Sequence, residues 1–199
     1  MKKFLTLAVV ALLAVGANAQ KGSTYIGTSG ISFWNTDENA GPTSSGFLTG
    51  FNIGTGDLKG SQFGVAPELG YFVADNMAIG ASLGFTLTNP DGDNNNITSL
   101  GIAPYFRYFL VQKGNFGLYL QAGGQYDINF YQADGVDNLN HFNVGVLPGI
   151  SYAFSDKFSA AASFGWLGYD YWKQGDSDGG TVGLKVNGSS LNFGLYYNF

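Results

Sequence analysis

Charged side chains are scarce in this chain, and two of them stand inside stretches of apolar and small residues. Charged residues make up 12% of the 199 residues; Arg107 is the single arginine, and Glu68 is one of two glutamates. A charge held away from water is costly unless a partner neutralises it. We therefore predict an internal ion pair between Glu68 and Arg107, with Asp127 as a further polar neighbour. A proton- or ion-conducting role for the pair is the alternative.

Nucleophilic and metal-binding chemistry has few candidates. The chain has no cysteine and one histidine, His141, which excludes thiolate and multi-histidine metal sites. The sequence His141-Phe142-Asn143 has no serine two positions after the histidine, so we interpret His141 as a polar rim residue. The acidic segments 91–96 and 176–179 are predicted to be loops, because a calcium loop starting at 91 would need a glutamate where Ile102 stands. We predict no catalytic residue, no metal and no cofactor.

Composition excludes other classes of protein. Glycine occurs 31 times, aromatic residues make up 16% of the chain, and the net charge is −5. Such a composition disfavours both a water-soluble helical enzyme and a disordered chain. With no run of basic residues, we expect no binding to nucleic acid.

The first residues predict export. Lys2 and Lys3 precede a 12-residue, almost entirely apolar run at 4–15, and Ala17-Asn18-Ala19 is a small-residue cleavage site. This pattern is typical of a signal peptide over 1–19, and the apolar run is too short to span a membrane as a helix. We therefore divide the chain into a signal peptide at 1–19 and one domain at 20–199.

The rest of the chain alternates with a period of two residues. From 115 to 130, Phe, Leu, Ala, Tyr and Ile at even positions alternate with polar or small residues at odd positions. Successive side chains of a strand point to opposite faces, so each run predicts a long strand. A tilted strand of about 9–11 residues already crosses a bilayer. Eight strands are predicted, at 23–34, 60–74, 77–89, 97–111, 115–130, 142–154, 157–171 and 191–199.

The connections alternate between short and long. Short turns are predicted at 75–76, 112–114 and 155–157, and longer connections at 35–59, 90–96, 132–139 and 172–188. This alternation is typical of a closed, antiparallel, up-and-down transmembrane β-barrel whose short turns face the periplasm. Segments 47–54 and 181–186 also alternate, and we interpret them as strands that rise above the membrane. A ten-strand barrel is the alternative, but it would put all three short turns outside.

The alternation assigns side chains to the two faces of the barrel. On the outward face, we predict that Tyr71, Tyr108 and Tyr152 form an aromatic girdle near the periplasmic end. The interior of an eight-stranded barrel is just wide enough for side chains to fill it. Large rings beside many glycines predict a plugged lumen, with Phe72, Tyr105, Phe109, Tyr119, Tyr169 and Tyr196 pointing inward.

Two motifs carry a resemblance to a known family. The segment Pro-Glu-Leu-Gly-Tyr-Phe-Val-Ala-Asp-Asn-Met-Ala-Ile-Gly at 67–80 and the terminal Leu-Asn-Phe-Gly-Leu-Tyr-Tyr-Asn-Phe at 191–199 resemble those of small eight-stranded outer-membrane barrels, the OmpA/OmpX-like group. The resemblance implies localisation in the outer membrane. It also implies that Phe199 is part of the signal that the barrel-insertion machinery recognises.

The predicted function follows from this architecture. We expect a monomeric barrel, not an enzyme, with a structural or surface-interaction role in adhesion or envelope integrity. Its expected partners are the lipid bilayer, lipopolysaccharide and, during biogenesis, the barrel-insertion machinery. A narrow channel or a porin for small or hydrophobic compounds is the alternative, and a lipid-modifying enzyme is a third possibility.

Overall fold

The computed structural model describes residues 21–31, 49–54, 60–90, 96–133, 135–186 and 191–199. Within these ranges the chain is all-β and contains no helix. In particular, these ranges hold no helix with the length and apolar character needed to cross a membrane. The signal peptide predicted at 1–19 lies outside the described residues.

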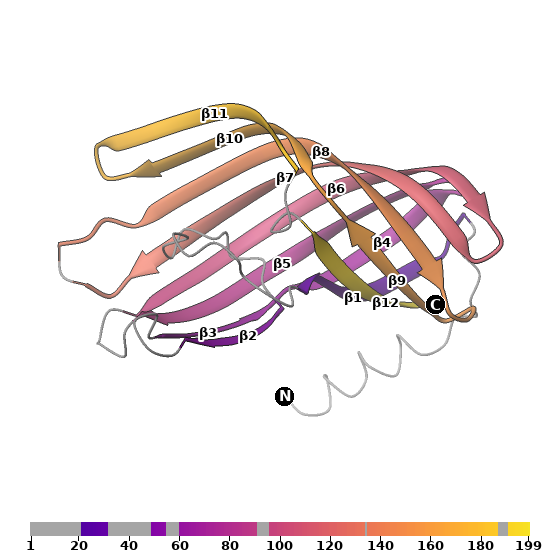
Figure 1. Cartoon of the computed structure of the whole chain (residues 1–199), viewed down its shortest axis with the longest axis horizontal. Helices are drawn as coiled ribbons and strands as arrows, with labels where there is room; N and C mark the ends of the chain where they lie inside the picture. The colour runs from indigo at the N-terminus through magenta and orange to yellow at the C-terminus, as the bar shows by residue number, and fades with distance from the viewer. Residues whose placement is uncertain (1–20, 32–48, 55–59, 91–95, 134, 187–190) are drawn as a thin grey trace.

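Long strands form one continuous antiparallel sheet, as the period-two pattern predicts (Figure 1). Several of them exceed the usual length of about 5–6 residues; β6 has 17 residues and β7 has 16. The strands are β1 (Thr24–Ile31), β2 (Gly50–Gly54), β3 (Gly60–Val65), β4 (Pro67–Ala74), β5 (Met77–Pro90), β6 (Ile97–Lys113), β7 (Phe116–Tyr131), β8 (Leu139–Ala153), β9 (Phe158–Ser163), β10 (Trp166–Gln174), β11 (Ser177–Lys185) and β12 (Asn192–Asn198).

The sheet closes on itself as an eight-strand barrel. Its ring runs β1–β4–β5–β6–β7–β8–β9–β12 and returns to β1 through the pairing of β1 with β12. Closure satisfies the backbone hydrogen bonds of each strand within the sheet, which a spanning structure requires in lipid. The predicted eight-strand fold is confirmed.

Four further strands extend the wall beyond this ring. β2 pairs with β3, and β10 and β11 form a hairpin whose β10 pairs with β8. The interpretation of 47–54 and 181–186 as wall extensions therefore agrees with the pairing of β2 and β11. Among the described residues, no pairing joins β2 to β11.

Two predicted connections differ from the structure. The turn expected at 112–114 lies at Gly114–Asn115, because β6 continues through Lys113 and Gly114 takes a φ of 57° that suits glycine. The long loop expected at 172–188 is largely the β10–β11 hairpin, which turns tightly at Gly175 with a φ of 56°. The turn that joins β10 to β11 lies at the opposite end of the barrel from the β6–β7 turn (Figure 1).

The seventh predicted strand, at 157–171, is divided by a bulge into β9 and β10. The bulge exchanges the inward and outward positions after it. Ser163 lines the lumen, Phe164 is exposed, and Gly165, with a φ of 70°, precedes Trp166, which lines the lumen again. The prediction that Tyr169 points inward is therefore wrong: Tyr169 is opposite the exposed Val144 and faces outward. The other five predicted lumenal rings, Phe72, Tyr105, Phe109, Tyr119 and Tyr196, are buried.

The closed barrel predicts heat-modifiable migration. Every strand of the ring is paired on both sides, so unfolding has no free edge in the ring at which to begin. Unboiled protein in detergent should run faster on a gel than boiled protein. Equal mobility of the two samples, together with recovery in a soluble fraction, would contradict the barrel.

Candidate functional site in the barrel lumen

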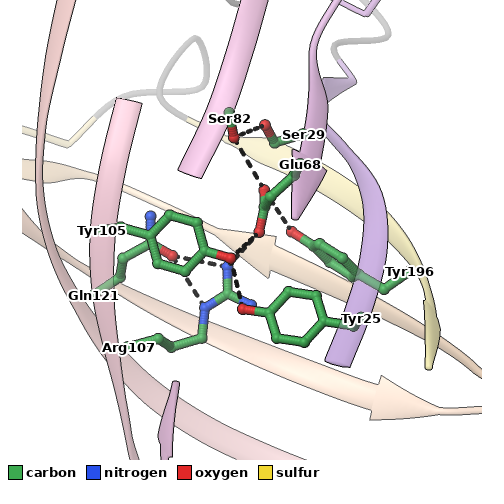
Figure 2. Close-up of polar contacts among 8 residues, drawn as sticks. All are labelled: Tyr25, Ser29, Glu68, Ser82, Tyr105, Arg107, Gln121 and Tyr196. Atoms are coloured by element: carbon green, nitrogen blue, oxygen red, sulfur yellow. Dashed lines mark hydrogen bonds and ion pairs between the residues drawn. The ribbon is translucent and has the colours of Figure 1, made fainter. Parts of the chain in front are cut away.

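The structure brings Glu68 and Arg107 together inside the barrel (Figure 2). Glu68 on β4 and Arg107 on β6 are both buried, and Arg107 Nη2 lies 3.4 Å from Glu68 Oε1. Gln121 on β7 completes the acceptor set, because its Oε1 accepts from Arg107 Nε at 3.0 Å and from Nη2 at 2.8 Å. The guanidinium is therefore held in one orientation between two acceptors on different strands.

Glu68 is also the acceptor for three hydroxyl groups. Tyr105 donates to Oε1 at 2.6 Å, Tyr196 donates to Oε2 at 3.3 Å, and Ser82 donates to Oε2 at 3.4 Å. Tyr25 extends the network, because its hydroxyl lies 2.5 Å from that of Tyr105 (Figure 2). Since the Tyr105 hydroxyl donates to Glu68, its oxygen is free to accept from Tyr25. A carboxylate with this many donors tolerates burial far better than a bare one.

Aromatic rings enclose the guanidinium on several sides. Its Cζ lies 4.7 Å from the ring centroid of Tyr119, 4.9 Å from Tyr105, 5.5 Å from Tyr196 and 5.9 Å from Tyr25. Faces of aromatic rings attract cations, more strongly where water is excluded. Because β6 and β12 lie on opposite sides of the ring of strands, contact between Arg107 and Tyr196 spans the lumen.

A layer of rings continues the cluster toward the β6–β7 turn. Phe72 stacks on Phe109 with 5.8 Å between centroids, and Tyr119 and Tyr25 pack against this pair. Glycines on neighbouring strands make room for the rings. A Cβ at Gly149, for example, would collide with the ring of Tyr119. The half of the lumen nearer the β6–β7 turn, called the inner half below, is thus filled by side chains.

Asp127 and His141 form a separate group nearer the outer end. The prediction that Asp127 neighbours the Glu68–Arg107 pair is wrong, because Asp127 is directly opposite His141 in the β7–β8 register. Asp127 Oδ1 lies 3.1 Å from His141 Nδ1, and Asp170 Oδ2 lies 2.9 Å from Nε2. Ionised carboxylates only accept, so a ring with both nitrogens protonated satisfies both contacts. His141 is therefore an ion-pairing residue of the wall, not an isolated rim histidine.

A large cavity lies on the outer side of the Arg107 cluster. Its volume is about 1060 Å³; Glu68, Tyr105 and Arg107 line it together with His141 and Asp170. In the described residues, no three His, Asp or Glu side chains are placed to hold a metal ion. The site thus has a filled inner half and a hollow outer half.

The comparison with protein families decides the class. The family model described as "Outer membrane protein beta-barrel domain" matches residues 5–199. The chain belongs to this family. Membership identifies it as an outer-membrane β-barrel. No curated protein matches the chain.

Several solved outer-membrane proteins match the chain at low identity. The N-terminal β-barrel domain of Pseudomonas aeruginosa OprF is 17% identical with a TM-score of 0.46, and the match covers 90% of this chain and 99% of that domain. Neisserial surface protein A is 17% identical with a TM-score of 0.40, covering 92% and 96%. OprG from Pseudomonas aeruginosa is 12% identical with a TM-score of 0.46, covering 90% and 97%.

The residues predicted for the membrane boundary lie near the short turns. Tyr71 and Tyr152 are exposed on the outer surface, and Tyr108 is opposite Met77, the first residue of β5. Phe199 donates its backbone N–H to the carbonyl of Thr24 at 2.8 Å, and its ring lies 5.0 Å from that of Tyr197. These positions suit a girdle for this outer-membrane barrel, and the role of Phe199 in insertion stays a prediction.

Sequence reasoning missed several members of the two lumenal groups. Gln121 and Tyr25 lie on inward positions of predicted strands, so the alternation could have found them. Asp170 could not be placed this way, because the bulge at Gly165 moves it to the inward face.

The Glu68–Arg107 pair predicts strong coupling in a double-mutant cycle. Glu68→Gln or Arg107→Met alone leaves a buried charge without its partner, and should cost roughly 3–5 kcal/mol of unfolding free energy. The double variant should lose much less than the sum of the two. Urea unfolding of the refolded barrel in lipid vesicles measures all four proteins.

The control for this cycle is Lys113→Met, which removes an exposed charge at the β6–β7 turn. We expect a change within about 0.5 kcal/mol. Additive losses from Glu68→Gln and Arg107→Met would show that the two groups do not interact.

Proposed function

We propose that this outer-membrane protein is a monomeric structural and surface-interaction barrel whose lumen is closed by its own side chains. The observation that carries the proposal is the Arg107 cluster. It joins Tyr25 on β1, Glu68 on β4, Gln121 on β7 and Tyr196 on β12. With Arg107 itself on β6, these strands lie on opposite sides of the ring, so the contacts cross the lumen rather than follow one wall.

The energetic cost of opening this cluster supports closure. Glu68 and Arg107 are 3% and 6% exposed; both carboxylate oxygens of Glu68 accept hydrogen bonds, and Nε and Nη2 of Arg107 donate to neighbours. Water or an ion passing along the axis would have to displace these contacts and the ring layer below them. A narrow channel is the alternative function, and conductance separates the two.

The outward surface supports a barrel that acts through its exposed ends. Large apolar side chains cover the outside of the wall, among them Leu83 at 58% and Leu195 at 55% exposure, which suits contact with lipid. The outer ends carry the β10–β11 hairpin and the acidic segment 176–179, which we propose face lipopolysaccharide and the surroundings. In the described chain both nitrogens of His141 face carboxylates, an arrangement that supports a non-enzymatic role.

The closed lumen predicts little conductance. Purified protein in planar lipid bilayers should show no sustained single-channel steps, whereas Arg107→Ala should show them because it removes the side chain that bridges the cluster. Lys113→Ala, at an exposed turn, should behave like the wild type. Steady conductance of the wild type, unchanged in Arg107→Ala, would favour the narrow-channel function.

The alternation of short and long connections predicts which end is exposed to the outside. An epitope tag inserted at Gly135 should be labelled on intact cells, because this exposed connection buries little backbone. The same tag at Asp75 should be labelled only after the outer membrane is permeabilised. Labelling of the Asp75 tag on intact cells would reverse the topology.

A further inference from the structure

The wall of the outer cavity is organised in rows across β7, β8 and β10. The strand registers place Gly123, Gly145 and Gly168 side by side, and Gln125, Asn143 and Asp170 side by side in the next inward-facing row. Asp127, His141 and Trp172 form the third row. Directly opposite residues on one face have Cβ atoms about 4.5–5.5 Å apart. The glycine row, which has no side chains, thus lies beside the row of the Asp170 carboxylate and the Gln125 and Asn143 amides. The indole of Trp172 lies in the next row toward the outer end.

The glycines hold two indole rings against the wall. A Cβ at Gly145 would come within 2.5 Å of Trp166 Nε1, and one at Gly168 within 2.7 Å of Trp166 Cζ2. A Cβ at Gly179 would lie 3.0 Å from Trp172 Nε1. Both rings line the cavity, and Trp172 is 40% exposed. Because the glycine backbone supports one side of the Trp172 ring, its other side is available to the cavity.

Several polar groups of this wall have unused hydrogen-bonding capacity. Within the described part of the chain, the Asn143 amide and the Trp172 indole N–H have no hydrogen-bond partner, and Gln125 uses only its Nε2, which donates to Asp127 at 2.7 Å. Asp170 uses one oxygen for His141. In the Arg107 cluster both Glu68 oxygens are occupied, whereas this row offers donors and acceptors side by side in a space of about 1060 Å³. Ligand pockets usually measure about 300–1,000 Å³.

Among the residues that the structure describes, the charges around the cavity balance. Three carboxylates, those of Glu68, Asp127 and Asp170, are matched by Arg107, by His141 with both nitrogens protonated, and by Lys185, whose Nζ lies 5.4 Å from the Trp166 ring centroid. A cavity with no charge excess gives no general preference to an ion. It favours a neutral solute that can use many hydrogen bonds and one aromatic face.

We propose that the outer cavity binds a neutral mono- or disaccharide from outside the cell. The sugar ring lies on the free face of Trp172, and its hydroxyl groups exchange hydrogen bonds with Asp170, Asn143 and Gln125. Hydroxyl groups both donate and accept, which matches a row made of a carboxylate and two amides. The inference rests on the proposed function in one respect. If side chains close the lumen below the cavity, the solute is bound there and is not transported.

Saturation-transfer NMR on the barrel in a sugar-free detergent tests the site, with methyl α-glucoside and maltose as probes. We expect saturation transfer to a neutral sugar, and about tenfold weaker binding by Trp172→Ala and by Asp170→Asn. Trp172→Phe should recover part of the affinity because it retains an aromatic face. Tyr169→Ala, on the same strand but facing outward, should bind like the wild type, and heat-modifiable migration of each variant reports its folding.

Two results would overturn the proposal. Absence of transfer to either sugar at tens of millimolar would mean that the cavity holds only water. Tighter binding of glucosamine or glucuronate than of the neutral sugars would mean that charge determines recognition. Both results are independent of the conductance measurement, so they leave the closed lumen as a separate question.

Discussion

The buried guanidinium of Arg107 is the group on which the inner half of the lumen depends. It carries five N–H donors and a charge that cannot be lost, so it requires acceptors and aromatic faces on every side. Glu68, Gln121 and the tyrosines supply them from strands on both sides of the lumen. These tyrosines in turn need glycines opposite them, as Gly149 shows for Tyr119. Part of the high glycine content is therefore a consequence of one buried cation.

A second constraint comes from the lipid around the barrel. If the alternation of β9 continued unbroken into β10, Tyr169 would face the lumen and Asp170 would face the apolar outer surface. The bulge at Gly165 prevents this, since it inserts one residue and turns Asp170 inward to His141. The same shift brings Trp166 and Trp172 to the cavity. A single residue with a φ of 70° thus decides which side chains of the seventh strand meet lipid and which meet the lumen.

The wall of this barrel can be predicted from the sequence more completely than its interior. Period-two alternation is a local signal, so the eight strands, the short turn at 75–76 and the pairing partners Glu68 and Arg107 could all be predicted from it. Contacts across the lumen depend on register and on interruptions of that pattern. The predicted lumenal position of Tyr169 is wrong for this reason, and Asp127 belongs to a different cluster from the predicted one because its neighbours follow from the β7–β8 register. Gly165 was the one visible signal of the shift, but a glycine in so glycine-rich a chain carries little information.

The two halves of the lumen differ in how completely their polar groups are satisfied, and this difference separates a structural role from a binding role. Around Arg107, both oxygens of Glu68 and the Nε and Nη2 groups of the guanidinium have partners on other strands, so a solute could bind to these groups only by breaking those contacts. Along Gln125, Asn143 and Asp170, neighbouring side chains leave donors and acceptors open toward a space kept free by glycines. Aromatic rings and glycines also meet in both halves, but with opposite effect. In the inner half the rings project across the lumen and fill it, whereas in the outer half the tryptophans lie against the wall and leave the axis open. The same small set of residue types therefore builds a plug at one level and a binding surface at the next.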